Sequence, residues 1–148
     1  MAFPLNYDDA IPLDAEELAE GGVVEGYKSV LSKLRKFVEN PATIEEDFDD
    51  DAPSYSVRCC GSQFDIYAPN LDEDEGNSWG RATVALFFMV NAQLKNSTHR
   101  FYAINGGNDL FGMFLMPAEA TAAQKSLPNK ADWPYLPKEE DPWYGQYH

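Results

Sequence analysis

The segment from Ser78 to Lys95, SWGRATVALFFMVNAQLK, constrains the fold more than any other part of the chain. Its positions 84–90 are all apolar, so a helix here has no polar face to turn toward water. Other elements must therefore cover it. We expect this segment to form a central buried helix, with the rest of the fold arranged around it.

Two pairs of short segments predict β-hairpins. RFYAI at 100–104 and LFGMFL at 110–115 are joined by Asn-Gly-Gly-Asn-Asp, whose residues tolerate the positive φ angles of a tight turn. The segments 55–58 and 64–67 alternate apolar and polar residues, and the Gly-Ser pair between them is typical of a turn. Within the later hairpin, Gly112 predicts a bulge or the close approach of another backbone.

Three further segments predict helices. Asp14 is a candidate N-cap, with Glu17 three residues later completing a capping box, and a pair of glycines ends this short helix. Apolar residues at spacings of three and four predict a longer amphipathic helix over 27–38. A last helix is expected over 117–127, where a proline can occupy the first turn.

This order of elements predicts an α+β fold, in which an antiparallel sheet of about four strands, formed by two hairpins, packs with three to four helices. We expect a single domain over residues 1–148. It would begin with an irregular arm at 1–13 and end with an extended, aromatic and proline-rich tail at 129–148. Trp133 and Tyr135 are expected to anchor this tail on the core.

The net charge of the chain is -14, from 25 acidic and 11 basic residues, and it argues against nucleic acid and anionic membranes as partners. Four of the basic residues lie on the polar side of the helix over 27–38, either as a solvated face or as a local basic patch. No apolar run is long enough for a membrane span, so a cytoplasmic location is expected. Cys59 and Cys60 are adjacent in a predicted strand, where their side chains would point to opposite faces, so we expect free thiols.

Two acidic runs form the candidate partner-binding surface. Like charges at this density repel one another, so the first run, at 45–51, is expected to be a mobile loop held off the core. The second run, at 72–75, precedes the buried helix, whose dipole favours negative charge at its N-terminus. The candidate partner-binding residues are Glu45, Glu46, Asp47, Asp49, Asp50, Asp51, Asp72, Glu73, Asp74 and Glu75.

Patterns for catalysis and cofactor binding are missing from the sequence. No nucleophile is placed to pair with His99 or His148, and Asp65 or Asp109 could act as a base only if burial raised its pKa. The residues from Asp72 onward imitate the opening of a calcium loop, but the glycine and the glutamate are not at the required places. No spacing suits zinc, and neither glycine pair fits a phosphate loop, because Gly21-Gly22 ends a helix and Gly106-Gly107 lies between two antiparallel strands. We therefore expect no catalytic residue, no cofactor and no metal.

The chain resembles the cognate immunity proteins of bacterial toxin or secreted-effector systems. The resemblance is carried by the small acidic domain, the EEDFDDD and DEDE runs, and the combination of SWGRATVALFF with YAINGGNDLFGMFL and DWPYLP. It implies non-catalytic, stoichiometric inhibition of a cognate toxin or effector that has a basic active-site surface. Aromatic or arginine anchors would be needed at the centre of such a contact. The candidates are Trp79, Trp133, Trp143, Tyr144 and Arg81.

Three other functions are left open. A small-ligand-binding or regulatory module of a bacterial cytosolic system would contain a deep apolar pocket with a few polar groups. A DNA mimic would space its carboxylates like phosphates over an extended face. An enzyme would need a cleft in which a carboxylate or His99 meets a second catalytic group at hydrogen-bond distance.

Overall fold

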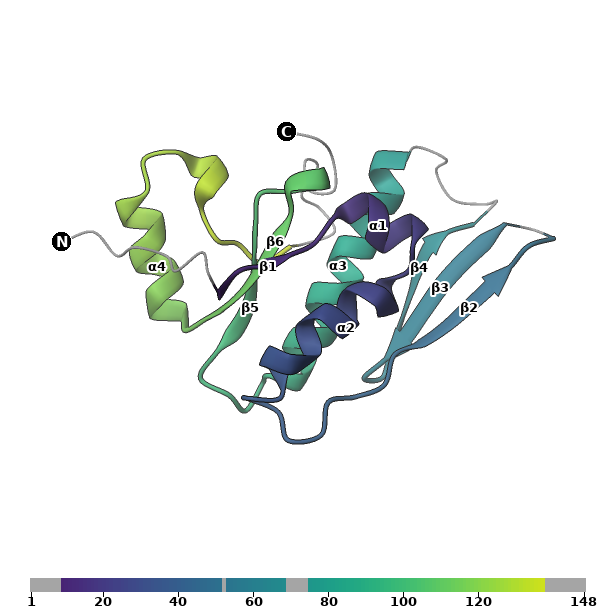
Figure 1. The fold of residues 1–148 in the computed structure, drawn as a ribbon, viewed down its shortest axis with the longest axis horizontal. Coiled ribbons are helices and arrows are strands. Elements are labelled where there is room, and N and C mark those ends of the chain that lie inside the picture. Colours follow the sequence, from purple (N-terminus) through teal and green to yellow (C-terminus); the bar gives the residue numbers. More distant parts are fainter. Residues whose placement is uncertain (1–8, 52, 69–74, 138–148) are drawn as a thin grey trace.

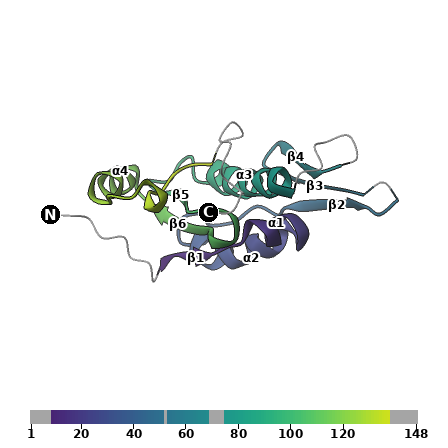
Figure 2. The ribbon, with the colours of Figure 1, turned by 90° about the horizontal axis from the view of Figure 1, so that it is seen from above.

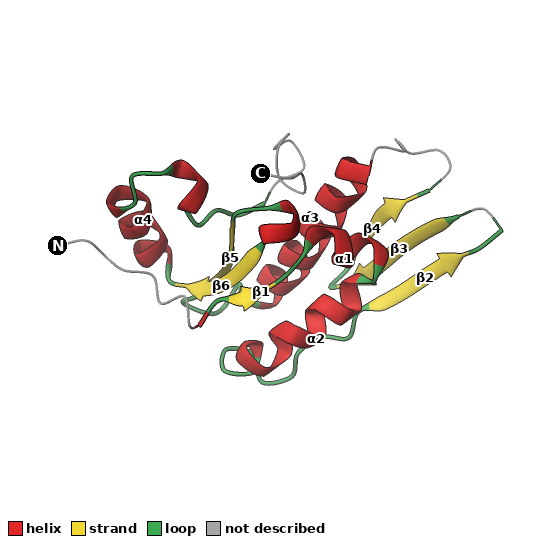
Figure 3. Cartoon of the chain, turned by 45° about the horizontal axis from the view of Figure 1, so that its top comes forward, coloured by secondary structure: helices red, strands yellow, loops and turns green. Residues whose placement is uncertain are grey.

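The computed structural model describes residues 9–51, 53–68 and 75–137 and confirms the α+β fold (Figure 1). In this part of the chain there are two antiparallel sheets of three strands each, where the sequence predicted one sheet of about four (Figure 3). The four α-helices are α1 (Ala15–Glu20), α2 (Val23–Leu34), α3 (Glu75–Gln93) and α4 (Pro117–Ser126). The first sheet has the order β1 (Ile11–Pro12), β6 (Phe111–Leu115) and β5 (Arg100–Ile104). The second has the order β2 (Glu45–Asp49), β3 (Ser54–Cys59) and β4 (Ser62–Tyr67).

Helix α3 lies at the centre of the molecule, as the sequence predicts. It contacts β5 of the first sheet on one side and β4 of the second sheet on the other, while α1 and α2 form a layer beside it (Figures 1 and 2). Of its apolar run, Leu86, Phe87 and Met89 are almost completely buried. Phe88 is 48 % exposed, and its ring lies against that of Phe64 in β4. The cover over α3 is therefore open at this position.

The two N-terminal helices approach each other closely. Asp14 caps α1 as predicted, because its Oδ1 accepts hydrogen bonds from the amides of Glu16 at 2.9 Å and Glu17 at 3.4 Å. In α2, a Cβ added at Gly26 would clash with the side chain of Leu18 in α1. The glycine at this position therefore allows the close packing of α1 on α2.

Both ends of the described chain contribute to the first sheet. β1 lies inside the segment predicted as an irregular arm and pairs with β6. Near the other end, Tyr135 forms an isolated bridge with Ala103 of β5 through two backbone hydrogen bonds, and its hydroxyl donates to the carbonyl of Asn105 at 2.6 Å. Tyr135 thus anchors the tail, as expected. Residues 138–148 of the predicted tail lie outside the described residues.

Gly112 in β6 makes room for an aromatic contact between the first sheet and α3. The pairing of β5 with β6 has a regular register, so the predicted bulge is wrong. The close neighbour is a side chain and not a backbone, because a Cβ at Gly112 would overlap the ring of Phe101. Phe101 is fully buried and stacks on Phe87 of α3 at a centroid distance of 4.6 Å.

Replacing Gly112 with alanine should destabilise the protein by about 1–3 kcal/mol, since the new methyl group must displace the Phe101 ring from a packed core. Urea denaturation followed by circular dichroism measures the change. In the background of Phe101→Leu, the same substitution should cost less, because the smaller side chain leaves space. An unchanged unfolding midpoint for Gly112→Ala would contradict the close approach.

Candidate functional site

The first acidic run forms an edge strand, so the prediction of a mobile loop over 45–51 is wrong for its first five residues. β2 pairs with β3 along its whole length, from Glu45 opposite Arg58 to Asp49 opposite Ser54. Successive side chains of a strand point to opposite faces, and the carboxylates are therefore divided between two environments. This division, together with the backbone pairing, offsets the repulsion on which the loop prediction was based.

On the outer face of the second sheet, Arg58 of β3 bridges two carboxylates of β2. Its Nη2 lies 2.8 Å from Glu45 Oε2, and its Nη1 lies 2.5 Å from Asp47 Oδ2. The hydrogen bond with Glu45 and the charge of Asp47 raise the pKa of the Arg58 guanidinium. All three side chains remain exposed, so water and salt screen these pairs. Their main effect is to hold the two carboxylates in a defined arrangement.

On the other face, Glu46 belongs to a partly buried hydrogen-bond chain. The hydroxyl of Tyr55 donates to Glu46 Oε2 at 2.5 Å and accepts from the amide of Val23 at 2.7 Å. Val23 is the first residue of α2, and its N-cap residue, Gly22, has no side chain that could cap the helix. Tyr55 therefore supplies the missing cap, and the Glu46 carboxylate is placed near the positive end of the α2 dipole. Glu46, one of the predicted partner-binding residues, is therefore engaged in a contact within the fold itself.

Phe48 is the exposed aromatic residue of the acidic strand. Its side chain is 58 % exposed, and its ring stacks on that of Tyr55 at a centroid distance of 4.4 Å with an interplanar angle of 6°. Tyr55 itself is fully buried. Phe48 therefore presents one ring face to solvent while the other rests on the core.

The remaining predicted residues of the run lie at the tip of the hairpin. Asp49 ends β2, while Asp50 and Asp51 are exposed in the turn to β3, at the end of the molecule opposite α4 (Figure 1). Asp49 Oδ1 accepts a hydrogen bond from the Asp51 amide at 3.0 Å. Of the second run, residues 72–74 lie outside the described residues, and Glu75 is the first residue of α3. The structure thus brings five exposed carboxylates together on β2 and its turn: Glu45, Asp47, Asp49, Asp50 and Asp51.

Three residues of this surface were not singled out from the sequence: Phe48, Tyr55 and Arg58. A sequence signal for the strand β2 does exist. It is the apolar Phe48 in the middle of an acidic run, followed by the alternating segment 55–58. The ion pair of Arg58 with Asp47 spans eleven positions of sequence, and its ion pair with Glu45 spans thirteen. Such contacts follow from strand register, which the charge pattern alone does not determine.

At the opposite end of this hairpin, the structure joins Cys59 and Cys60 in a disulfide, so the prediction of free thiols is wrong. The opposite orientation of neighbouring side chains applies within a strand, but β3 ends at Cys59. Cys60 has a φ of 60°, in the left-handed region, and this turn conformation brings its sulfur to that of Cys59. A polar groove of about 390 Å³ adjoins the pair.

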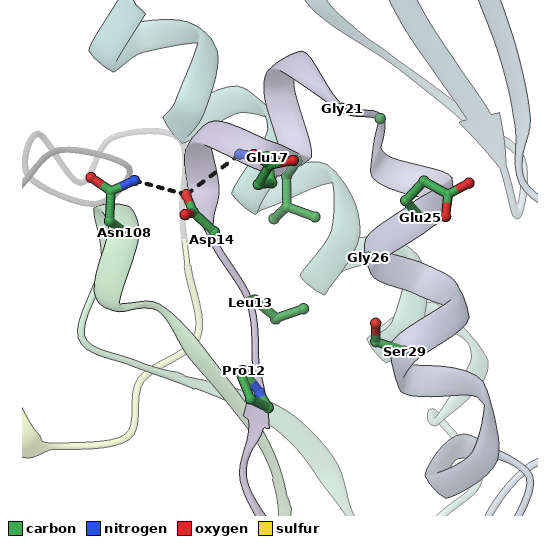
Figure 4. Close-up of a pocket in the computed structure, with 11 residues that line it drawn as sticks. Pro12, Leu13, Asp14, Glu17, Gly21, Glu25, Gly26, Ser29 and Asn108 are labelled. Atoms are coloured by element: carbon green, nitrogen blue, oxygen red, sulfur yellow. Dashed lines mark hydrogen bonds between the residues drawn. The ribbon is translucent and has the colours of Figure 1, made fainter.

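A second groove, of about 410 Å³, lies between α1 and α2 (Figure 4). Its lining includes the carboxylates of Asp14, Glu17 and Glu25. Two of them already have partners: Asn108 donates to Asp14 at 2.9 Å, and Lys28 pairs with Glu25 at 3.1 Å. The groove is therefore not the deep apolar pocket that a small-ligand module would contain.

The candidate catalytic residues are not assembled into an active site in the described part of the chain. The ring of His99 contacts the hydroxyl of Thr98 at 2.9 Å and the ring of Phe37, and no ion pair with a carboxylate is present there. Asp65 is exposed on β4 beside Gln63, and Asp109 is exposed in a short 3-10 helix, η2 (Gly107–Asp109). Across the described ranges, no group of three His, Cys, Asp or Glu side chains could hold a metal ion.

The candidate anchor residues are scattered over the molecule. Trp79 packs against the core from the first half of α3, and its buried indole nitrogen has no hydrogen-bond partner among the described residues. Trp133 is half-buried and donates to the carbonyl of Leu127 at 2.9 Å, which fastens the tail to α4. Arg81 donates to the carbonyl of Ile66 at 2.7 Å. Trp143 and Tyr144 lie outside the described residues.

Replacing Tyr55 with phenylalanine should destabilise the protein by about 1–3 kcal/mol, because the amide of Val23 and the carboxylate of Glu46 lose their common partner. Tyr67→Phe, which removes a hydroxyl from the neighbouring strand, is the matched control and should cost less. Urea denaturation of the three proteins makes the comparison. Equal midpoints for wild type and Tyr55→Phe would refute the capping role.

Stability should also fall as the pH rises above about 10. Burial raises the pKa values of Tyr27, Tyr55 and Tyr102, and the hydrogen bond to Glu46 raises that of Tyr55 further. Unfolded tyrosines ionise near pH 10, whereas the raised pKa values keep these three neutral to a higher pH in the folded state, so the unfolded state is favoured progressively above pH 10. Unfolding free energies measured between about pH 8 and 11 should decline less steeply for Tyr55→Phe than for wild type. Parallel pH profiles would contradict the raised pKa of Tyr55.

Comparison with known proteins adds no family to this description. No family model matches the chain, and no curated protein or solved structure matches it significantly. The functional argument therefore depends on the residues and contacts described above.

Proposed function

We propose that this protein is a non-catalytic inhibitor of the immunity-protein kind, which binds a cognate bacterial toxin or effector enzyme and occludes its basic active-site surface. The observation that supports this proposal best is the acidic strand β2 with its turn. This strand runs toward the end of the molecule opposite α4 (Figure 1), its backbone is fixed by pairing with β3, and five carboxylates are exposed along the strand and its turn. An acidic surface of this kind is complementary to a channel that binds phosphates or other anions.

Electrostatic attraction lets such an acidic surface speed the association with a basic partner. A net charge of -14 attracts a basic protein at long range, and the local cluster orients the encounter. Complementary charge of this kind raises association rates toward about 10⁸–10⁹ M⁻¹s⁻¹ at low salt. An immunity protein needs fast association because a free toxin molecule can act before it is captured.

The location proposed for this function is the cytoplasm, where a toxin acting inside the cell would meet its inhibitor. None of the helices in the described residues is long and apolar enough to cross a membrane. A partner with a basic surface would be bound in solution, without nucleic acid or membrane as a second ligand.

A small-ligand-binding or regulatory module is the second candidate function. It would use the groove between α1 and α2, which has Ser29, Glu17 and Glu25 in its lining but is not a deep apolar pocket (Figure 4). This candidate predicts that a small polar metabolite protects the α1 and α2 amides from hydrogen exchange. The inhibitor hypothesis predicts protection of the second sheet by a protein.

The test of the proposed function begins with the protein that co-purifies with this chain from its native cell. The Asp47→Asn, Asp50→Asn, Asp51→Asn variant should associate with that partner about tenfold more slowly at low salt, with a weaker salt dependence. The matched control, Glu25→Gln, Glu39→Gln, Asp109→Asn, removes the same charge elsewhere and should slow association less. Stopped-flow fluorescence measures both rates.

Three results would contradict the proposed function. The first is equal association rates for wild type and the β2 variant. The second is a captured partner whose enzymatic activity is not inhibited by the chain. The third is turnover of a substrate by the purified chain itself.

A further inference from the structure

β2 has a free backbone edge. In the order β2, β3, β4 it is an outer strand, and its five residues pair with β3 on one side only. Among the described residues, no backbone hydrogen bond joins its other side to another segment, and no helix or strand lies along that side in Figures 1 and 3. Alternate residues of such an edge point their N–H and C=O groups to solvent, where a strand from another molecule can pair with them.

The charges of β2 decide which strand can pair there. Arg58 is the one basic residue within β2, β3 and β4, so the face that carries Glu45, Asp47 and Asp49 keeps a net negative charge. In a second copy of β2, acidic residues would be placed against acidic residues, and like charges directly opposite each other are unfavourable. A strand with lysine or arginine at every second position would meet the opposite charge. The edge is thereby closed to self-association and open to a basic segment.

On the opposite face of the same strand, Phe48 favours a partner segment with apolar side chains. Its ring is 58 % exposed and lies flat on the buried ring of Tyr55, so it offers a fixed apolar surface at the sheet edge. Side chains on this face of an added strand would contact the ring. The matching segment therefore alternates basic residues on one face with apolar residues on the other, over about five residues, since β2 has five.

The edge is also held in place before any partner binds. The Glu46 side chain is tied through the Tyr55 hydroxyl to the start of α2, and Arg58 holds Glu45 and Asp47. A strand that is already ordered loses little conformational entropy on binding.

We infer that the partner docks by strand addition: an extended basic segment of it pairs with the free edge of β2 as a fourth strand of the second sheet, with apolar side chains against Phe48. This inference rests on the proposed function and specifies its binding mode. It differs from simple charge attraction because it requires backbone hydrogen bonds in a fixed register.

The probe that separates the two modes is the capped peptide Thr-Lys-Val-Lys-Val-Lys-Thr, measured against the full-length protein by fluorescence anisotropy. Two control peptides have the same charge and are N-methylated either at the three lysines or at the two valines, which blocks one backbone edge or the other. The control that is methylated on the edge away from β2 should bind like the unmodified peptide. The control that is methylated on the edge facing β2 should bind about ten- to a hundredfold more weakly, because it loses two or three backbone hydrogen bonds. Equal affinities of all three peptides, or no binding of any, would overturn strand addition.

Amide hydrogen exchange then tests the same edge with the co-purified partner. The solvent-facing amides of β2 should exchange at least about tenfold more slowly in the complex, since each gains a hydrogen-bond acceptor. Phe48→Ala should weaken partner binding, while Phe88→Ala, which truncates the exposed phenylalanine of α3, should not. If the partner is bound and inhibited but the β2 amides exchange as in the free protein, strand addition is wrong and the proposed function stands. If no inhibited partner is found, the proposed function fails.

Discussion

The burial of α3 is the constraint on which the rest of the structure depends. Its apolar run has no polar side, so each neighbour of this helix must bring an apolar surface of its own. Two sheets and a pair of helices meet this requirement together, and the sheets are therefore separate instead of continuous (Figure 3). The aromatic stack of Phe87 on Phe101 shows how tight the cover is, since a glycine is needed at position 112 to admit it.

Because the second sheet is fixed to α3 through β4, the strand farthest from the helix is left at the edge of the molecule. That strand is β2, and it carries the highest density of negative charge in the described chain. Tyr55 connects this strand to the interior, because its ring is buried and its hydroxyl joins Glu46 to the first turn of α2. The acidic surface is therefore an ordered part of the fold, with a definite backbone edge and an exposed aromatic ring.

The pairing of β2 with β3 changes how the acidic residues should be understood. A mobile acidic loop could attract a basic partner but could not impose a register on it. An ordered strand can do both, because its carboxylates, its backbone groups and Phe48 have fixed relative positions. The carboxylates of the groove between α1 and α2 are less available to a partner, since Asp14 accepts a hydrogen bond from Asn108 and Glu25 pairs with Lys28.

Much of the fold could be predicted from local patterns. The central helix, the N-cap at Asp14, the hairpin over 100–115 and the anchoring role of Tyr135 all depend on residues close in sequence or on a strong apolar signal. The acidic run was misjudged because its repulsion was weighed without the strand that pairs with it. The two cysteines were misjudged because the strand ends between them, and only the turn conformation of Cys60 brings their sulfurs together.

The sequence by itself determined the α+β class, the buried helix and the large negative charge, since these follow from composition and periodicity. Only the tertiary structure decided that the strands form two sheets, that Gly112 faces the ring of Phe101, and that the acidic run becomes an ordered edge. The physical reason is that these features depend on contacts between residues far apart in the chain. The ion pairs of Arg58 with Glu45 and Asp47, and the hydrogen bond between Tyr55 and Val23, exist only once the strands and helices have packed in their final register.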